Sequence, residues 1–175
     1  MINLIYNNII KYIHAYGKHA ILCGLAGALF YMLISPKQSI KKKKWNCFIV
    51  FCFVSYLYMV YALTILSRSE SYISNVNWIP FATFRSSEWD RMFFYENILL
   101  FFPLPVFLYL LHPIFRKFWT GTMIGLFLSS LIEVLQYLFH CGWCDIDDIL
   151  TNTVGAILGW LFIYGILHCD DEGTG

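Results

Sequence analysis

Long apolar stretches alternate with short polar segments along this chain. About 20 apolar residues are enough for a helix to cross the hydrocarbon core of a bilayer, and five stretches approach or reach that length. They are residues 19–34, 45–66, 93–111, 118–139 and 149–168. The pattern therefore predicts an all-α, polytopic membrane protein with about five transmembrane helices, which together form a single membrane domain over residues 19–168.

The two ends of the chain depart from this apolar pattern. In residues 1–18, isoleucines alternate with asparagine, lysine and histidine at helical spacing. This alternation is typical of an amphipathic helix that lies in the membrane interface. Residues 169–175 contain three acidic residues, so we expect a short acidic tail after the last span.

Composition agrees with a membrane protein and argues against some partners. Hydrophobic residues make up 59% of the chain and charged residues 13%, against about 25% charged residues in soluble domains. The net charge is +1, and the basic residues are scattered or lie beside apolar stretches, so nucleic-acid binding is not expected. The sequence contains no phosphate-binding loop and no dinucleotide motif, and we expect no cofactor.

Two of the six cysteines, Cys141 and Cys144, form a CxxC pair beside His140. Zinc would need further thiolate or imidazole ligands, which the rest of that surface hardly offers. Outside the cell the pair could form a strained, redox-active disulfide. The favoured interpretation is two small residues packed at a helix corner, and no metal site is predicted.

Basic residues indicate how the predicted helices cross the membrane. With the first and third loops inside the cell, seven lysines and arginines lie on the cytoplasmic side and five on the other. Loops rich in lysine and arginine tend to remain cytoplasmic. We therefore expect the N-terminus outside the cell, the C-terminus in the cytoplasm and the protein in the plasma membrane.

Polar residues occur inside the last two predicted spans at helical spacing. Ser129, Glu133 and Gln136 share one face of the fourth span, and Asp148 and Asn152 share one face of the fifth. An ionisable residue inside a membrane is costly, so its presence favours a functional site. Two GxxxG pairs, Gly121/Gly125 and Gly155/Gly159, are expected to let these two helices approach each other.

The orientation brings many polar side chains to the outer face, where we predict a ligand-binding site. Its predicted members are Asn97, Ser129, Glu133, Gln136, Asp145, Asp147, Asp148 and Asn152, with Arg68 and Arg91 to meet phosphate or carboxylate groups. An aromatic segment in the long second loop suits the headgroup layer, and its predicted contact residues are Trp78, Pro80 and Phe81.

Four short motifs carry a resemblance to a known family. In order along the chain they are Asn77-x-Ile-Pro-Phe, Asn97-Ile-Leu-Leu-Phe-Phe-Pro-Leu, Gly125-xxx-Ser129-xxx-Glu133-xx-Gln136 and Asp145-Ile-Asp147-Asp148-xxx-Asn152-Thr-Val-Gly155. Over roughly residues 45–160, the chain resembles the VanZ-like family of small bacterial membrane proteins. Cys141-Gly142 replaces the Gly-Arg that this family usually shows before the last motif. The resemblance implies a role in tolerance to teicoplanin and related lipidated glycopeptides.

Several interpretations of the polar residues remain open at this point. Glu133 and Gln136 could lock helix packing through Ser129 or Asn152, or could bind a ligand or a proton. The acids at Asp145–Asp148 could cap a helix, bind a basic or amide-rich ligand, or hold a divalent cation.

The first functional hypothesis is a non-enzymatic protein that binds the acylated antibiotic or a lipid-linked cell-wall precursor. The alternatives are an enzyme acting on a lipid phosphate or headgroup, with the divalent cation at Asp145–Asp148, and a small transporter. Membrane lipids are expected partners in every case. The oligomeric state stays open.

Overall fold

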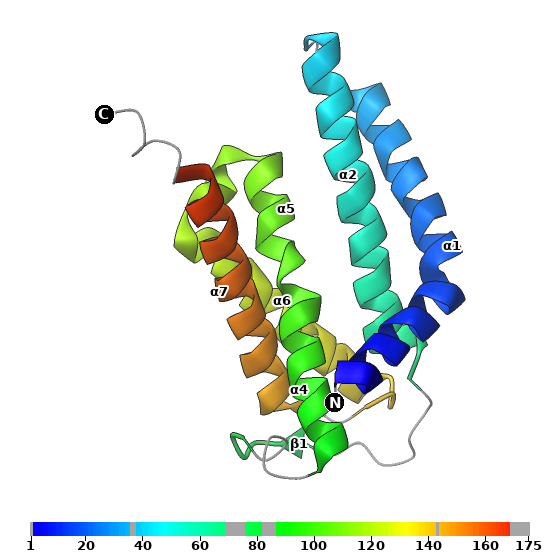
Figure 1. The fold of residues 1–175 in the computed structure, drawn as a ribbon, viewed down its shortest axis with the longest axis vertical. Helices are drawn as coiled ribbons and strands as arrows, with labels where there is room; N and C mark the ends of the chain where they lie inside the picture. The colour runs from blue at the N-terminus through cyan, green and yellow to red at the C-terminus, as the bar shows by residue number, and fades with distance from the viewer. Residues whose placement is uncertain (1, 36–37, 69–75, 82–86, 143, 169–175) are drawn as a thin grey trace. The chain divides into compact units, whose positions relative to one another are not determined.

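The computed structural model describes residues 2–35, 38–68, 76–81, 87–142 and 144–168. The acidic tail predicted at residues 169–175 lies outside these ranges. Within the described ranges, five helices are long and apolar enough to cross a membrane: Asn3–Ile34, Ile40–Leu66, Arg91–Leu111, Phe118–Leu138 and Ile146–His168. The predicted all-α fold with five candidate membrane spans is therefore confirmed (Figure 1).

The first of two compact units, Ile2–Arg68, is a helical hairpin. Its first helix, α1 (Ile2–Ile34), runs without a break through both the stretch predicted to be amphipathic and the first predicted span. Figure 1 shows that the beginning of α1 lies at an angle to the rest of that helix. The second helix, α2 (Ile40–Tyr61), packs along α1 and continues into a π-helical turn, η1 (Ala62–Leu66).

Two glycines set the distance between α1 and α2. A Cβ atom added to Gly24 would lie 2.7 Å from the carbonyl oxygen of Phe51, and one added to Gly27 would lie 2.7 Å from the side chain of Val54. Small residues of this kind let helices approach closely where lipid surrounds them. Van der Waals packing at these glycines therefore contributes to holding the hairpin together.

The second unit begins at Ser69 and contains the remaining elements. Its helices are α4 (Glu88–Phe101), α5 (Pro103–Leu111), the 3₁₀ turn η2 (Pro113–Arg116), α6 (Phe118–Leu138) and α7 (Ile146–His168). The third predicted span is thus two helices that meet at Phe102, because Pro103 and Pro105 cannot donate the hydrogen bonds of a continuous helix. Two short strands, β1 (Val76–Asn77) and β2 (Cys144–Asp145), pair in parallel.

The last helix, α7, is the centre of this second unit. It packs against α6 and against both α4 and α5. Near the end of α7, Tyr109, Trp160 and Ile163 form an apolar core. The beginning of α7, in contrast, buries polar side chains, which are described below.

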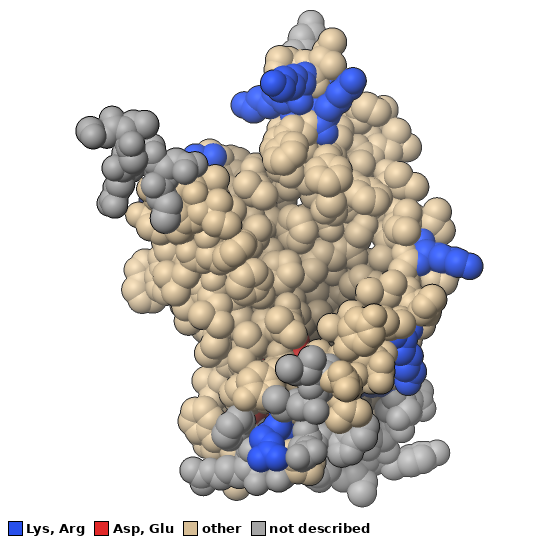
Figure 2. Space-filling view, in the orientation of Figure 1, with Lys and Arg blue, Asp and Glu red and all other residues tan. Residues whose placement is uncertain are grey.

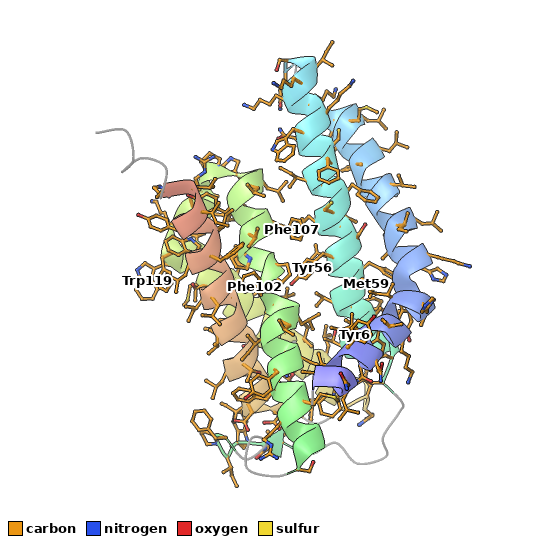
Figure 3. The ribbon with its side chains drawn as sticks, viewed as in Figure 1. Tyr6, Tyr56, Met59, Phe102, Phe107 and Trp119 are labelled. Atoms are coloured by element: carbon orange, nitrogen blue, oxygen red, sulfur yellow. The ribbon has the colours of Figure 1, made fainter. Side chains whose placement is uncertain are left out.

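The surfaces of these helices that face away from the core are apolar. Trp119 and Phe127 of α6 and Phe162 of α7 are among the large side chains that are half or more exposed, and Figure 3 shows Trp119 at the outer edge of its unit. Residues other than Lys, Arg, Asp and Glu cover most of the described surface in Figure 2, where acidic side chains are almost out of sight. In a membrane protein such surfaces face lipid.

Candidate functional site

Glu133 is held between the end of α6 and the beginning of α7. Its side chain is 1% exposed, and its Oε2 atom accepts a hydrogen bond of 2.9 Å from the backbone N–H of Asp145 in β2. Ser129 and Gln136 are fully buried on the same face of α6. The predicted polar face of this helix is therefore turned into the protein.

Asp145 connects this carboxylate to the first strand. Its carboxylate oxygens accept hydrogen bonds of 3.3 and 3.2 Å from the side-chain amide of Asn77, and one of them also accepts a bond of 2.9 Å from the backbone N–H of Asp147. Asn77 and Asp145 are also partners in the pairing of β1 with β2. The segment before α4 is thereby fixed to the segment before α7.

Asp147 holds the residues that follow β1. Its side chain is 2% exposed, and Oδ1 accepts a hydrogen bond of 2.5 Å from the backbone N–H of Phe81. Phe81 has a φ of 61°, which is uncommon for any residue with a Cβ atom and costs about 1–2 kcal/mol. The bond to Asp147 helps offset that cost.

The segment Trp78–Phe81, which we call the aromatic turn, presents its side chains to the outside. Trp78 and Ile79 are each 69% exposed, and Phe81 is 52% exposed. The backbone N–H of Ile79 donates to the side-chain oxygen of Asn77, at 3.1 Å. Two backbone N–H groups of this segment, those of Ile79 and Phe81, thus bond to side chains of the protein, whereas its large side chains are exposed.

Two further hydrogen bonds extend this network toward the middle of the helices. The Asn97 amide of α4 donates to Asp148 at 2.7 Å, and the Asn152 amide of α7 donates to Ser129 of α6 at 2.9 Å. We call the linked residues the polar cluster, which comprises Asn77, Asn97, Ser129, Glu133, Asp145, Asp147, Asp148 and Asn152. Three helices and two strands contribute to it.

Further along α6 and α7, away from the polar cluster, the helices come close together at glycines and not through hydrogen-bonded polar groups. Gly125 of α6 faces Ala156 of α7, as the GxxxG pattern predicts. Gly155 and Gly159, however, face α4 and α5, since a Cβ atom on them would overlap the carbonyl oxygens of Ile98 and Phe102. The prediction that both glycine pairs join α6 to α7 is therefore wrong for the second pair, because α7 packs against two partners at once.

The end of α6 positions the two cysteines of the CxxC pair. His140 has a φ of 53°, and the backbone N–H of Cys141 donates to the Gln136 carbonyl at 3.0 Å; these are features of a Schellman cap, in which glycine is the usual left-handed residue. Both cysteines are free thiols. Burial raises the pKa of the Cys144 thiol, and the carboxylates of Glu133 and Asp145 raise it further.

The remaining predicted binding residues are not shown to join the polar cluster. Arg68 is exposed and belongs to the first unit, so its contribution stays a prediction. Arg91 is half-buried in the first turn of α4, and its contact with a ligand also stays a prediction. Among the described residues, no group of three or more His, Cys, Asp or Glu side chains could hold a metal ion.

Asn77 is the main residue that the sequence-based binding set omitted. Its bond to Asp145 depends on a strand pairing across 68 positions, whereas its bond to the Ile79 N–H is local. The asparagine of the Asn77-x-Ile-Pro-Phe motif was the available signal, because asparagine commonly accepts from the backbone two residues later.

Comparison with known proteins gives the same assignment as the four motifs. A family model described as VanZ/LLP1 matches residues 47–168. The chain belongs to the VanZ/LLP1 family. The match includes every member of the polar cluster.

One relative of known name is Protein VanZ from Enterococcus faecium. It is 38% identical to this chain over 73 residues, which are 41% of this chain and 43% of that protein. The matched region therefore covers less than half of this chain and less than half of Protein VanZ. No solved structure matches the chain.

Proposed function

We propose that this VanZ/LLP1 protein gives low-level resistance to teicoplanin and related lipidated glycopeptides. In this proposal it binds the acylated antibiotic, or a lipid-linked envelope molecule that the antibiotic needs, at the end of the protein that carries the aromatic turn. This end faces the outside of the cell, as the distribution of basic residues predicts.

The observation that supports this proposal best is the way the aromatic turn is held. Hydrogen bonds to Asp145 and Asp147 fix the backbone around it, while Trp78, Ile79 and Phe81 remain exposed. A binding surface that is already ordered loses less conformational entropy when its ligand arrives. An acyl chain at the membrane surface is a ligand that such an apolar surface suits.

In this proposal the polar cluster positions the turn, and most of its members do not contact the ligand. Glu133, Asp147, Ser129 and Asn152 are almost fully buried. Backbone N–H groups and asparagine amides are among the donors that contact the cluster carboxylates. Asp145 and Asp148, which are only half-buried, are the acidic members closest to solvent.

The alternative, an enzyme with a divalent cation at Asp145–Asp148, receives less support. The three carboxylates accept from different donors, namely Asn77, Phe81 and Asn97. A hard cation would need several of their oxygens to converge at 2.3–2.6 Å or less. Asp145 and Asp147 therefore have positioning roles that an ion shared by the three acids would disturb.

Antibiotic susceptibility of a sensitive Gram-positive host tests the proposal. The host would express the wild type, Phe81→Ala or Trp119→Ala, with membrane levels measured for each. Trp119 is the control, because it is an exposed aromatic side chain like Phe81, at 70% against 52%, but lies at the end of α6 away from the polar cluster. We expect the wild type and Trp119→Ala to protect against teicoplanin, and Phe81→Ala to protect much less.

Unchanged susceptibility with and without the wild-type protein would remove the resistance function. Equal protection by Phe81→Ala and wild type would retain resistance but exclude the aromatic turn as the binding surface. Vancomycin, which lacks the acyl chain, provides the comparison within each strain, and protection should be smaller for it.

A further inference from the structure

The aromatic turn combines an exposed apolar surface with acidic residues directly behind it. Trp78, Ile79 and Phe81 project from a backbone that is bonded to Asp145 through Asn77 and to Asp147 through the Phe81 N–H. The apolar part of a ligand and its charged part would therefore meet two different surfaces within one short segment.

The sign of the charge at this end follows from the sequence. Among the charged side chains that the structure describes at this end of the second unit, five are acidic, namely Glu96, Glu133, Asp145, Asp147 and Asp148, and one is basic, Arg91. Even if Arg91 pairs with one of these acids, the balance stays negative. Partly buried charges are screened by salt less than fully exposed ones, so this field extends to a ligand at the surface.

We infer that the aromatic turn selects an amphiphile that carries both an acyl chain and a primary ammonium group. The acyl chain packs on Trp78, Ile79 and Phe81, and the ammonium lies over the acidic side of the turn near Asp145 and Asp148. This inference rests on the proposed function and narrows it, because it disfavours lipid-linked phosphates as ligands. Charge complementarity is the basis for the choice.

A pair of synthetic probes separates the two parts of the ligand. The first is a fluorescent lauroyl dipeptide with a free lysine amine, and the second is the same molecule with that amine acetylated. The full-length protein is placed in nanodiscs of zwitterionic lipid, and binding is followed by fluorescence anisotropy. We expect the free amine to bind about tenfold more tightly at low salt, which is the size expected for partly screened charges.

Ionic strength and variants then identify the surface. Raising the salt concentration from about 0.05 to 0.5 M shortens the screening length and should weaken binding of the free amine without changing the acetylated probe. Asp148→Asn should reduce the preference for the amine, and Phe81→Ala should weaken both probes. Trp119→Ala should leave both affinities unchanged.

The outcomes are distinguishable from those of the resistance test. Equal binding of the two probes, or tighter binding of a third probe that carries a phosphate in place of the amine, would overturn this inference even if the protein protects against teicoplanin. Selective binding of the amine in a protein that gives no protection would retain the inference and remove the resistance function. Loss of binding in Trp119→Ala as well would place the ligand elsewhere.

Discussion

The two ends of the α4–α7 unit are packed by different chemistry. At the beginning of α7, buried carboxylates and amides connect three helices and two strands by hydrogen bonds. Toward its end, glycines and aromatic rings pack the same helices, with Gly159 against Phe102 and Trp160 beside Tyr109. At the beginning of α7, hydrogen bonds determine which segments pack together. Toward its end, the complementary shapes of the side chains determine it.

This difference separates the two roles of the fold. The close glycine contacts leave room only for hydrogen atoms, so the apolar end tolerates little change in volume. The polar end holds a surface segment, the aromatic turn, in a conformation that its own residues do not favour, since Phe81 has a positive φ. We conclude that the apolar end stabilises the bundle and that the polar end positions the turn.

The largest expected effect tests the apolar end. In Gly159→Ala, the new Cβ atom would overlap the Phe102 carbonyl oxygen, and backbone cannot rotate away as a side chain can. We expect a loss of about 3 kcal/mol in unfolding free energy, measured by denaturation in detergent micelles. Gly165→Ala is the control, because nothing lies within 4 Å of its added Cβ atom; equal stability of the two variants would refute close packing at Gly159.

A smaller loss of unfolding free energy is expected for a substitution at the polar end. Asp147→Ala removes the acceptor for the Phe81 N–H, and a lost bond of this kind costs about 1–3 kcal/mol. Because Phe81 is near the surface, its N–H can bond to water instead, so the value should lie near the lower limit. Ligand binding at the turn should fall far more than stability, and a variant that binds as well as wild type would show that Asp147 does not position the turn.

Phe81→Gly is expected to act in opposite directions on stability and binding. Glycine adopts a φ of about 60° without steric cost, so the unfolding free energy should rise by up to about 1 kcal/mol. The aromatic ring is lost, and binding should weaken. Phe81→Ala is the matched variant, since it removes the ring but keeps the Cβ atom; if Gly and Ala variants are equally stable, the left-handed conformation costs nothing.

The smallest effect concerns the Cys144 thiol. Its pKa is raised by burial and by the charges of Glu133 and Asp145, and only the thiolate reacts with alkylating reagents. In a protein whose other cysteines are replaced by serine, alkylation of Cys144 should therefore become fast only at alkaline pH. Glu133→Gln removes one negative charge, so it should lower the pKa of Cys144 and raise its alkylation rate at pH 8 a few-fold. An unchanged pH profile would mean that no ionised Glu133 lies close to the thiol.

Much of the fold follows from the sequence because lipid-facing helices must be apolar along their length. The polar face of α6 also followed, since Ser129, Glu133 and Gln136 recur at helical spacing, and the structure buries all three. The break before Pro103 likewise follows from the missing proline hydrogen bonds.

The arrangement of the site depended on contacts between distant segments. The pairing of β1 with β2 involves two residues on each side, which is too short to give a strand pattern in the sequence. The true partners of Gly155 and Gly159 were also hidden, because a glycine spacing identifies a face of a helix but not the helix that it meets. Capping, ligand binding and cation binding all stayed open for the acids at Asp145–Asp148, and only their donors favour the positioning role.

Amide hydrogen exchange at Phe81 tests the central claim, that the polar cluster holds the aromatic turn, most directly. The Phe81 N–H lies in an exposed segment, but it donates to a buried carboxylate. We predict slow exchange at Phe81 in the wild-type protein in nanodiscs, and faster exchange by about tenfold or more in Asp147→Ala, with the Asp145 N–H less affected. Exchange of the wild-type Phe81 N–H at the rate of an unstructured peptide would contradict the account.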